Sequence, residues 1–506
     1  MRGQYDVIVV GAGNGGLAAA AAAAKNGLKT LLIEKHNIPG GCATSFRRGR
    51  FEFETSLHEL CDYGPANNPG PVRKLFTMLG VEVDWCVLPD TFRSIVIGPN
   101  GYDVAMPTGR KEFADKMEEY VPGSRQSIEQ IYSYADDLER TCAYLEECKG
   151  KPDPMVMLSE HANFMRLVPS TVNEVLNMIG MPKKAQYIFN TYWSYLGVDC
   201  DTLDFANYAL MTVSYITRGA YIPKMRSHEI SLALEKVVHE HGGDVWYNTE
   251  VTKILVKNGK AYGIAINDRE IYCDHIICNV NPHIVYGKMM DKKEVPERAI
   301  KLANARKFSQ SAYTVYIGLD KSPEELGIKD YTTFIYDTAD TVTLDASSAV
   351  IDNQSLAVNC LNIAIPECSP PGTSMLFFTK LYSEDCWKDV KIEDYVKTKN
   401  RVAEHAIEHY EKYCGVKIRD SIEEISAATP FTFARYLGSP SGDIYGYKGS
   451  KWDGMFQRLA VQEEEHFTQG LRFCGASSAW MHGYSQAYIS GGDAVMLTLR
   501  DIQAGY

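Results

Sequence analysis

"YDVIVVGAGNGGLAAAAAAAKNGLKTLLIE", from Tyr5 to Glu34, is the stretch that decides the fold. Its first six residues, Tyr5 to Val10, form a β-branched run typical of a strand buried in a parallel sheet, and a glycine-rich loop follows directly. In that loop Gly11 permits a tight turn, Gly13 lets a pyrophosphate approach the backbone, and Gly16 lets the next helix pack closely on the strand. The order strand, loop, helix predicts a dinucleotide-binding unit.

A second strand is expected over Leu28 to Glu34, and it ends on an acidic residue. Glu34 lies about 20 positions beyond the loop, where a carboxylate binds the ribose of an adenosine. A glycine motif alone also occurs in plain turns, but strand, loop, helix, strand and acid in this register specify a Rossmann-type site. This pattern leaves open whether NAD or FAD binds.

The bulk composition predicts a large globular protein that does not bind nucleic acid. A chain of 506 residues exceeds what one core usually supports, so two interleaved domains are expected. It is 45% hydrophobic and 23% charged, as in ordinary globular proteins. Acidic residues outnumber basic ones by 64 to 52, which gives a net charge of -12 and disfavours binding to a phosphate backbone.

Cysteine usage and hydropathy predict a cytoplasmic location. The 13 cysteines are odd in number and contain no CxxC pair, and no leader with a cleavage pattern precedes the first strand. The small-apolar run from Leu17 to Ala24 is too short to span a bilayer. Peripheral membrane contact stays open, because a lipophilic substrate would have to be collected from somewhere.

The segment from Ile38 to Leu60, "IPGGCATSFRRGRFEFETSLHEL", adds a second glycine turn behind the acidic residue. It resembles the phytoene desaturase, carotenoid isomerase and retinol saturase group of FAD-dependent oxidoreductases. The likeness recurs over Gly219 to His283, Ala428 to Tyr447 and Gly470 to Val495. Because nicotinamide-only dehydrogenases lack the extension, the resemblance implies noncovalent FAD.

The resemblance implies an α/β fold in which a Rossmann-type FAD-binding domain, like that of flavin amine oxidases and phytoene desaturases, is interleaved with an α+β substrate domain. The FAD-binding domain is expected to be discontinuous and to comprise residues 1–70, 219–300 and 421–506. The substrate domain, with a helical cap, is expected over residues 71–218 and 301–420.

Local patterns add several elements to this scheme. Amphipathic periodicity predicts helices over Arg110 to Tyr120, Gln126 to Glu147 and Glu229 to Glu240. Asn258-Gly259 predicts a tight hairpin turn. Tyr187 to Thr217 is rich in large apolar side chains, which are either ordinary core or, as a set, the lining of an apolar tunnel.

The resemblance also assigns cofactor residues. Its closing motif places the C-terminal segment beside the isoalloxazine ring, with a helix that begins near Ser485 and directs its N-terminal dipole at the pyrimidine side of the flavin. The residues expected to hold FAD are Gly11, Gly13, Asn14, Gly16, Glu34, Lys35, Gly40, Gly41, Cys42, Val251, Gly475, Ala476, Ser485 and Gln486.

Five residues are candidates for the chemical step. Flavin carries the electrons, but making or breaking a bond between carbon and hydrogen also needs a proton donor or base within reach. Tyr484, with His482 and Gln486 as neighbours, either packs on the ring or supplies that proton. His58 and Glu59 are either an ordinary buried pair or the proton relay.

Two departures from the resemblance concern the substrate. Trp480 to Gln486 replaces a stretch that is usually rich in glycine and proline, and Ser56 stands where the group has glycine after Phe53-Glu54-Thr55. Both changes add bulk or polarity close to the expected flavin, which disfavours a purely hydrocarbon substrate.

Two further signals are read as structural. His405, Glu408 and His409 spell an H-x-x-E-H pattern, but the surrounding helix is charged and no downstream ligand is evident, so no metal is predicted. Cys42 and Cys474 are expected to be small buried thiols without a covalent bond to flavin.

The resulting hypothesis is an FAD enzyme that exchanges hydride between flavin N5 and a carbon of a largely apolar, unsaturated substrate, by desaturation, saturation or double-bond isomerisation. Its electron donor or acceptor is open, because a second dinucleotide loop is not evident in the sequence. One alternative is a flavin amine oxidase, although Cys42 replaces the usual arginine after Gly-Gly. The other is a lipid-binding escort protein of the GDP-dissociation-inhibitor type, which Glu34 and the glycine loop disfavour.

Overall fold

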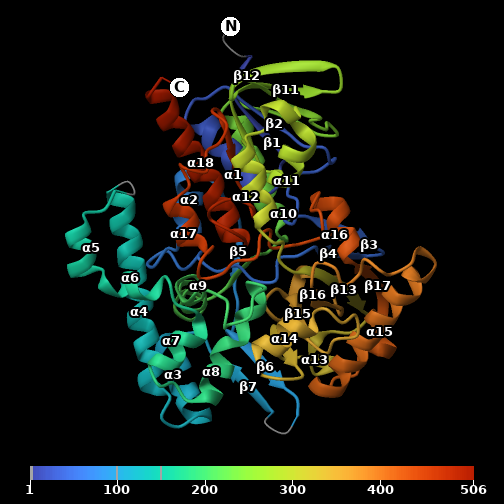
Figure 1. The fold of residues 1–506 in the computed structure, drawn as a ribbon. Helices are drawn as coiled ribbons and strands as arrows, with labels where there is room; N and C mark the ends of the chain where they lie inside the picture. Colours follow the sequence, from blue (N-terminus) through green and yellow to red (C-terminus); the bar gives the residue numbers. More distant parts are fainter. Residues whose placement is uncertain (1–3, 99–100, 149–150, 506) are drawn as a thin grey trace.

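Two seven-stranded sheets dominate the computed structural model, which describes residues 4–98, 101–148 and 151–505. Figure 1 shows the first sheet with both chain termini at one end of the molecule and the second sheet at the other end. The chain crosses between the two ends several times, so each sheet is built from distant segments.

The first sheet has the strand order β10-β11-β12-β1-β2-β9, and β18 pairs with β12. β1 runs parallel to both β2 and β12, and β10 to β12 form an antiparallel meander at one edge. The strands are β1 (Tyr5–Val10), β2 (Thr30–Ile33), β9 (Asp244–Trp246), β10 (Lys253–Lys257), β11 (Lys260–Ile266), β12 (Arg269–Cys278) and β18 (Leu471–Phe473).

Helices cover both faces of this sheet, and strand alternation decides which residues they meet. Val7 and Val9 of β1 pack with α1 (Asn14–Lys25), α2 (Pro71–Leu79), α10 (His228–Glu240) and α18 (Tyr484–Gln503). Ile8 and Val10 point the other way, toward α11 (Pro282–Ile284), the π-helical segment η2 (Val285–Met289) and α12 (Glu297–Ala305). The run of alanines in α1 is fully enclosed, which explains its small side chains.

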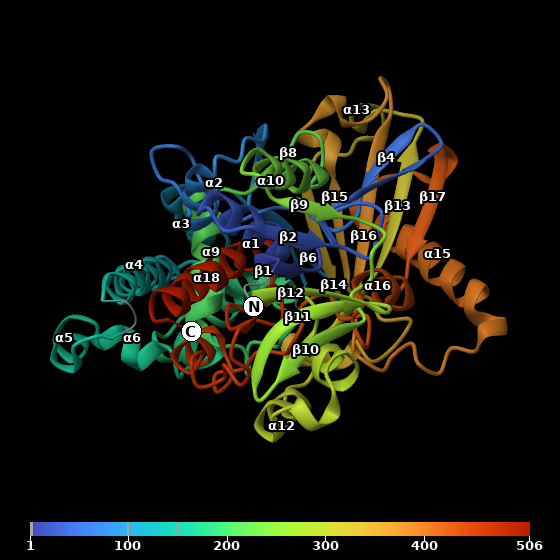
Figure 2. The same cartoon turned by 90° about the horizontal axis from the view of Figure 1, so that it is seen from above.

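The second sheet has the order β17-β13-β16-β15-β14-β6-β7 and is antiparallel except where β14 pairs with β6. Helix α15 (Tyr395–Cys414) covers its outer face, as Figure 2 shows from above. The strands are β6 (Phe92–Val96), β7 (Tyr102–Met106), β13 (Ser311–Leu319), β14 (Thr332–Tyr336), β15 (Leu356–Cys360), β16 (Ser374–Tyr382) and β17 (Ile422–Ala428).

A helical cap packs against the inner side of the second sheet through one large core. It contains α3 (Arg110–Tyr120), α4 (Arg125–Glu147), α5 (Pro154–Glu160), α6 (Ala162–Leu167), α7 (Val172–Met178), α8 (Lys183–Phe189), the 3-10 segment η1 (Asn190–Tyr195) and α9 (Phe205–Arg218). The predicted helix over Arg110 to Tyr120 is confirmed, and α4 and α10 each begin one residue before their predicted starts.

Short elements connect these layers. They are the hairpin β3 (Ser45–Arg48) with β4 (Phe51–Glu54), the pair β5 (Trp85–Val87) with β8 (Tyr221–Pro223), and the helices α13 (Pro323–Leu326), α14 (Thr341–Ser347), α16 (Pro430–Leu437) and α17 (Met455–Ala460). Single 3-10 turns are η3 (Lys292–Glu294), η4 (Leu361–Ile363), η5 (Pro366–Cys368), η6 (Ile392–Asp394) and η7 (Arg419–Ser421). The Asn258-Gly259 turn between β10 and β11 is confirmed, with φ of 54° and 75°.

The structure moves two of the predicted domain boundaries. Residues 421–506 were all expected in the FAD-binding domain, but β17 pairs with β13 and is an edge strand of the second sheet. Residues 71–218 were all expected in the substrate domain, but Val72 and Phe76 of α2 join the core beneath α1 and α18. In both cases the deciding contact is with a segment far away in the sequence, which a local pattern does not show.

The close packing of the first loop yields a prediction. A Cβ on Gly16 would lie 1.9 Å from the carbonyl oxygen of Gly11, so Gly16→Ala has to open the loop. We expect a loss of about 1–3 kcal/mol in the free energy of unfolding, measured by urea titration. Gly287→Ala is the matched control, because nothing lies within 4 Å of its added Cβ. Equal stability of the two variants would contradict this packing.

Candidate functional site

A cavity of about 1160 Å³ extends from the carboxyl ends of β1 and β2 to the inner face of the second sheet. Ligands of open parallel sheets bind at this edge. The volume exceeds the roughly 300–1,000 Å³ typical of pockets for drug-sized ligands. One cavity is therefore large enough to hold a dinucleotide and a second molecule.

Three glycine turns meet at the end of the cavity next to the first sheet. The Gly40 N–H donates to the carbonyl of Ala12 at 2.7 Å, and Gly13 and Gly40 form a β-bridge. A Cβ on Gly41, whose φ is +61°, would lie 3.3 Å from the Cα of Gly13. A Cβ on Gly15 would lie 2.6 Å from the backbone nitrogen of Gly475. These turns form a side-chain-free cradle of the kind that admits a pyrophosphate.

Glu34 lines the same end of the cavity. Its Oε2 accepts the Ala12 N–H at 2.7 Å and its Oε1 accepts the His36 N–H at 2.8 Å. A carboxylate has about four lone-pair sites, so two remain for ribose hydroxyl groups. The two backbone bonds fix the carboxylate against the glycine loop, and its binding of a ribose stays a prediction.

Asn279 is a residue of this end that the sequence reasoning missed. It follows β12 directly, and its side-chain nitrogen would lie 2.5 Å from a Cβ on Gly13. Its side-chain oxygen would lie 2.1 Å from a Cβ on Gly475. Its amide therefore sits between the glycine loop and the C-terminal segment. The available signal was its place after a strand adjacent to β1, where such sheets bind ligands.

The C-terminal segment covers the middle of the cavity. Helix α18 begins at Tyr484, one residue before the predicted Ser485, and Gly483 at φ 100° is its N-cap. The Tyr484 hydroxyl donates to the carbonyl of Cys42 at 2.8 Å, and Ser485 Oγ donates to the carbonyl of Cys61 at 3.0 Å. The N-terminus of α18 is thereby tied to the second glycine turn and faces the cavity with its positive dipole end.

Among the described residues, all of those predicted to hold a cofactor line the cavity except Gly16 and Gly40. Both act one layer behind it, through the close backbone contacts of the two turns. The Asn14 side-chain oxygen is buried without a partner. The lining members are Gly11, Gly13, Asn14, Glu34, Lys35, Gly41, Cys42, Val251, Gly475, Ala476, Ser485 and Gln486.

His482 lines the cavity but is deeply buried, and neither ring nitrogen has a partner. Burial, reinforced by the positive charge of Arg458, lowers the pKa of His482 to about 3. Its imidazole is therefore neutral near pH 7. It packs against the ring of Tyr445, another lining residue, at 5.3 Å between centroids. The geometry favours a packing role over that of a proton donor.

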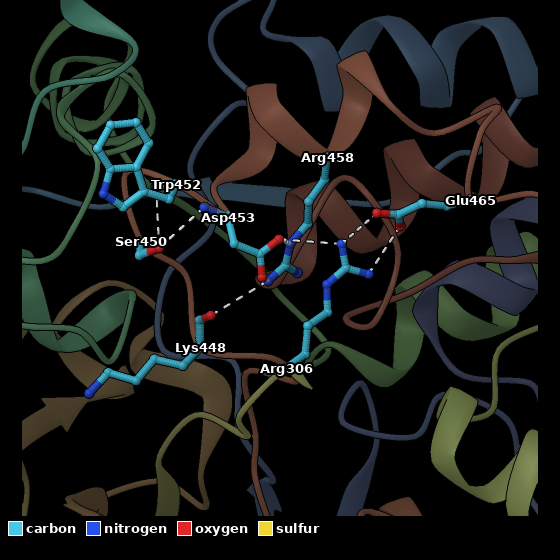
Figure 3. A network of polar contacts seen from close by, with 7 residues as sticks. All are labelled: Arg306, Lys448, Ser450, Trp452, Asp453, Arg458 and Glu465. Carbon is cyan, nitrogen blue, oxygen red and sulfur yellow. Dashed lines mark hydrogen bonds and ion pairs between the residues drawn. The ribbon is translucent and has the colours of Figure 1, made fainter. Parts of the chain in front are cut away.

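Arg458, whose charge acts on His482, belongs to an ion-pair network that Figure 3 shows. Both nitrogens on one edge of the Arg458 guanidinium, Nε and Nη2, bond to the two carboxylate oxygens of Asp453, at 2.9 and 2.8 Å. Arg306 bridges Asp453 and Glu465 at 3.3 and 3.0 Å. The Arg458 side chain is only 1% exposed, so this charge is desolvated and depends on its partners. The network fixes the loop that carries Tyr445.

His58 lies on the opposite side of the cavity. Its Nε2 is 3.2 Å from the Thr379 hydroxyl, and its carbonyl accepts the Tyr331 hydroxyl at 2.6 Å. Burial lowers the pKa of His58 to about 4, so this ring is also neutral near pH 7. Among the described residues, no hydrogen bond joins the side chains of His58 and Glu59, so their pairing as a two-residue relay stays a prediction.

Glu59 has a different environment from the two histidines. The Tyr195 hydroxyl donates to its Oε1, and its Oε2 is buried without a partner. Burial raises the pKa of Glu59 to about 8, and the bond from the Tyr195 hydroxyl opposes that rise. The carboxyl group is thus neutral near pH 7, in a cavity wall made mostly of aromatic rings.

The structure also bears on three sequence signals. No cluster of three or more His, Cys, Asp or Glu side chains suited to a metal ion occurs among the described residues, and His405 and His409 lie on α15 behind the second sheet. Burial raises the pKa of the Cys42 thiol to about 12. Within the described ranges, none of the helices has the length and apolar character to cross a membrane.

Comparison with known proteins gives distant relatives and a shared fold. The family described as "NAD(P)-binding Rossmann-like domain" matches residues 9–79. All-trans-retinol 13,14-reductase of Danio rerio is 27% identical and covers 88% of this chain and 77% of its own length. The chloroplastic prolycopene isomerase of Daucus carota is 24% identical and covers 88% of this chain and 72% of its own length. The chain is a distant homologue of both.

A solved structure of a putrescine oxidase double mutant superimposes with a TM-score of 0.65 at 14% identity and covers 98% of this chain and 99% of that one. This likeness confirms the predicted α/β fold, with a Rossmann-type sheet and a second mixed sheet. The distant homology confirms the resemblance inferred from the sequence motifs.

Tyr484 provides a test of its role. Its hydroxyl proton is already committed to the Cys42 carbonyl, so Tyr484→Phe should cost about 0.5–1.5 kcal/mol in the free energy of unfolding. Turnover should then fall by less than about tenfold, as a lost positioning bond predicts. A loss of roughly 10²-fold or more with full cofactor retention would instead make Tyr484 a proton donor.

Glu59 provides a test through stability. Its pKa is about 8 in the folded protein and ~4.3 in an unfolded chain, so between these values only the folded state retains the proton. The contribution of Glu59 to stability is therefore full below pH ~4.3 and is lost as pH rises toward 8. Glu59→Gln lacks this term, so its melting temperature relative to wild type should rise from pH 5 to pH 9. A difference that does not vary with pH would contradict the raised pKa.

Proposed function

We propose that the chain is an FAD-dependent oxidoreductase that exchanges hydride between the flavin and a carbon atom of a largely apolar, unsaturated substrate. The observation that carries the proposal is the single cavity that joins the glycine cradle and Glu34 to an aromatic chamber on the second sheet. The distant relatives are named for retinol and prolycopene, and we extend that kind of substrate to this chain.

The cofactor half of the cavity fits FAD. Glu34 would bind the ribose, and the loops around Gly13 and Gly41, which line the cavity and have no side chain at these two positions, would bind the pyrophosphate. The N-terminus of α18 would lie at the flavin ring, where a positive dipole end stabilises negative charge. When bound, FAD supplies a two-electron centre that accepts or delivers hydride.

The substrate half has an aromatic and small-residue lining. Tyr195, Tyr215 and Trp193 come from the cap, and Tyr336 and Thr379 come from the second sheet. Such a lining would bury an apolar chain and exclude water. In this half the neutral states of His58 and Glu59 suit an uncharged substrate.

A flavin amine oxidase is the second candidate, because Glu59 and Asp443 both line the cavity and a carboxylate would attract an ammonium group. Burial keeps Glu59 neutral near pH 7, and the hydroxyls of Ser439 and Ser441 already bond to Asp443. An unsaturated apolar substrate therefore ranks above an amine. The escort-protein alternative ranks third, because Glu34 and the glycine cradle are intact.

The proposal predicts a yellow protein with one noncovalent FAD per chain. Acid precipitation should release the flavin, and colour that stays in the pellet, or a colourless protein, would contradict it. Glu34→Gln removes the charge from the ribose contact and should weaken FAD binding roughly tenfold to a hundredfold, as expected for a lost charged hydrogen bond. Glu240→Gln, on the surface end of α10, is the matched control.

The substrate class is tested by anaerobic mixing. Polyenes, enones and amines are each added to the oxidised and to the dithionite-reduced holoenzyme while flavin absorbance is followed. We expect spectral changes with unsaturated apolar molecules. A response to amines alone would replace the proposal with the amine-oxidase alternative.

A further inference from the structure

Glu59 is enclosed by a stack of tyrosines. The rings of Tyr195 and Tyr215 both stack on Tyr192, at 5.0 and 4.8 Å between centroids, and Tyr195 also contacts Phe334 at 5.5 Å. The stack comes from η1 and α9 of the cap, whereas Glu59 follows the β3–β4 hairpin. The contact between Tyr195 and Glu59 therefore joins the two ends of the molecule at the cavity wall.

The backbone at Glu59 is held as firmly as its side chain. The Tyr215 hydroxyl donates to the Glu59 carbonyl at 3.3 Å, and Leu60 exchanges two backbone bonds with Tyr221, at 2.8 and 3.0 Å. Two residues further on, Cys61 accepts the Ser485 hydroxyl of α18. The carboxyl group is thus fixed at the cavity wall, near the start of the helix that would cover the flavin.

No cation compensates this carboxyl group. Among the described residues, none of the ion pairs includes Glu59. The titratable groups that act on it or that feel its charge are all phenols, from η1, α9 and the approach to β14: Tyr192, Tyr195, Tyr215 and Tyr331. Burial raises the pKa of each phenol above its usual value, so each stays neutral near pH 7.

The other titratable groups in the substrate half are poor proton donors near neutrality. Burial lowers the pKa of His58 to about 4 and that of His482 to about 3, so neither ring carries a proton to give. Burial raises the pKa of Asp443 only to about 6, which leaves it ionised at pH 7. Glu59, by contrast, is protonated at pH 7 and loses its proton at a pH close to 7. A group with these two properties is suited to act as a proton donor near neutrality.

We propose that Glu59 is the catalytic proton donor and that Tyr195 is the residue that positions its carboxyl group. The inference rests on the proposed function. A bound flavin would supply hydride to one carbon of a C=C bond, and Glu59 would give its proton to the other carbon as the π bond breaks. The electron pair would come from the flavin, which dithionite reduces beforehand in the assay, and the Glu59 carboxylate would regain its proton from solvent.

This role sets a pH dependence. A donor with a pKa of about 8 is active below that pH and loses its proton above it, so reduction should decline on the alkaline side near pH 8. The Tyr195 hydroxyl stabilises the ionised carboxylate and lowers its pKa. Tyr195→Phe should therefore move the alkaline decline to higher pH, which a merely structural residue would not do.

The test uses FAD-loaded protein. Infrared difference spectra between pH 6 and pH 10 should show a protonated carboxyl that disappears around pH 8 in wild type and is absent in Glu59→Gln. The absence of this carboxyl signal in wild type would overturn the inference, and the measurement requires no substrate. A colourless protein, by contrast, would count against the proposed function alone, because the infrared signal does not need flavin.

Turnover gives the second arm. Glu59→Gln should retain FAD and lower the rate of reduction by roughly 10²- to 10⁴-fold, the usual range for one general acid. Tyr215→Phe is the matched control, since the Tyr215 hydroxyl donates to the Glu59 carbonyl and not to its carboxyl group, so its loss should leave the alkaline decline in place. A wild-type rate in Glu59→Gln, or equal shifts in the Tyr195→Phe and Tyr215→Phe profiles, would overturn the inference.

Discussion

The architecture depends on backbone packed against backbone at the carboxyl edge of the first sheet. Gly16 lies against the Gly11 carbonyl, Gly15 lies against Gly475, and Gly491 of α18 lies against the Gly15 carbonyl, each at a distance that leaves no room for a Cβ. Because these contacts join the first and last helices of the chain, they bring the C-terminal segment over the cradle. The alanines of α1 follow from the same constraint, since larger side chains would separate the helices.

Burial then decides the charge state of the groups in the cavity. The cost of placing an unpaired charge in an apolar wall keeps His58 and His482 deprotonated and Glu59 protonated, so the three side chains are neutral together. By contrast, the buried Arg458 guanidinium is paired with the Asp453 carboxylate. The three neutral side chains of the cavity thus differ from the charged network that supports the adjoining loop.

Much of the fold could be predicted because its signals are local. The strand, loop and acid of Tyr5 to Glu34, and the helix α3, follow from residue spacing alone. Residues 422–428 were expected in the FAD-binding domain but form β17 of the second sheet, because their partner β13 lies about a hundred positions away. Asn279 and Tyr195 were missed for a similar reason, since each becomes informative only through a contact with Gly13 or Glu59 that the fold creates.

A crystal structure of the protein with FAD and an unreactive polyene would test the central claim most directly. The account predicts electron density for the adenosine at Glu34, for the pyrophosphate between the turns of Gly13 and Gly41, and for the flavin ring at the start of α18. The polyene should lie between that ring and Glu59. A flavin ring bound elsewhere, or a polyene separated from Glu59 by other side chains, would contradict the account.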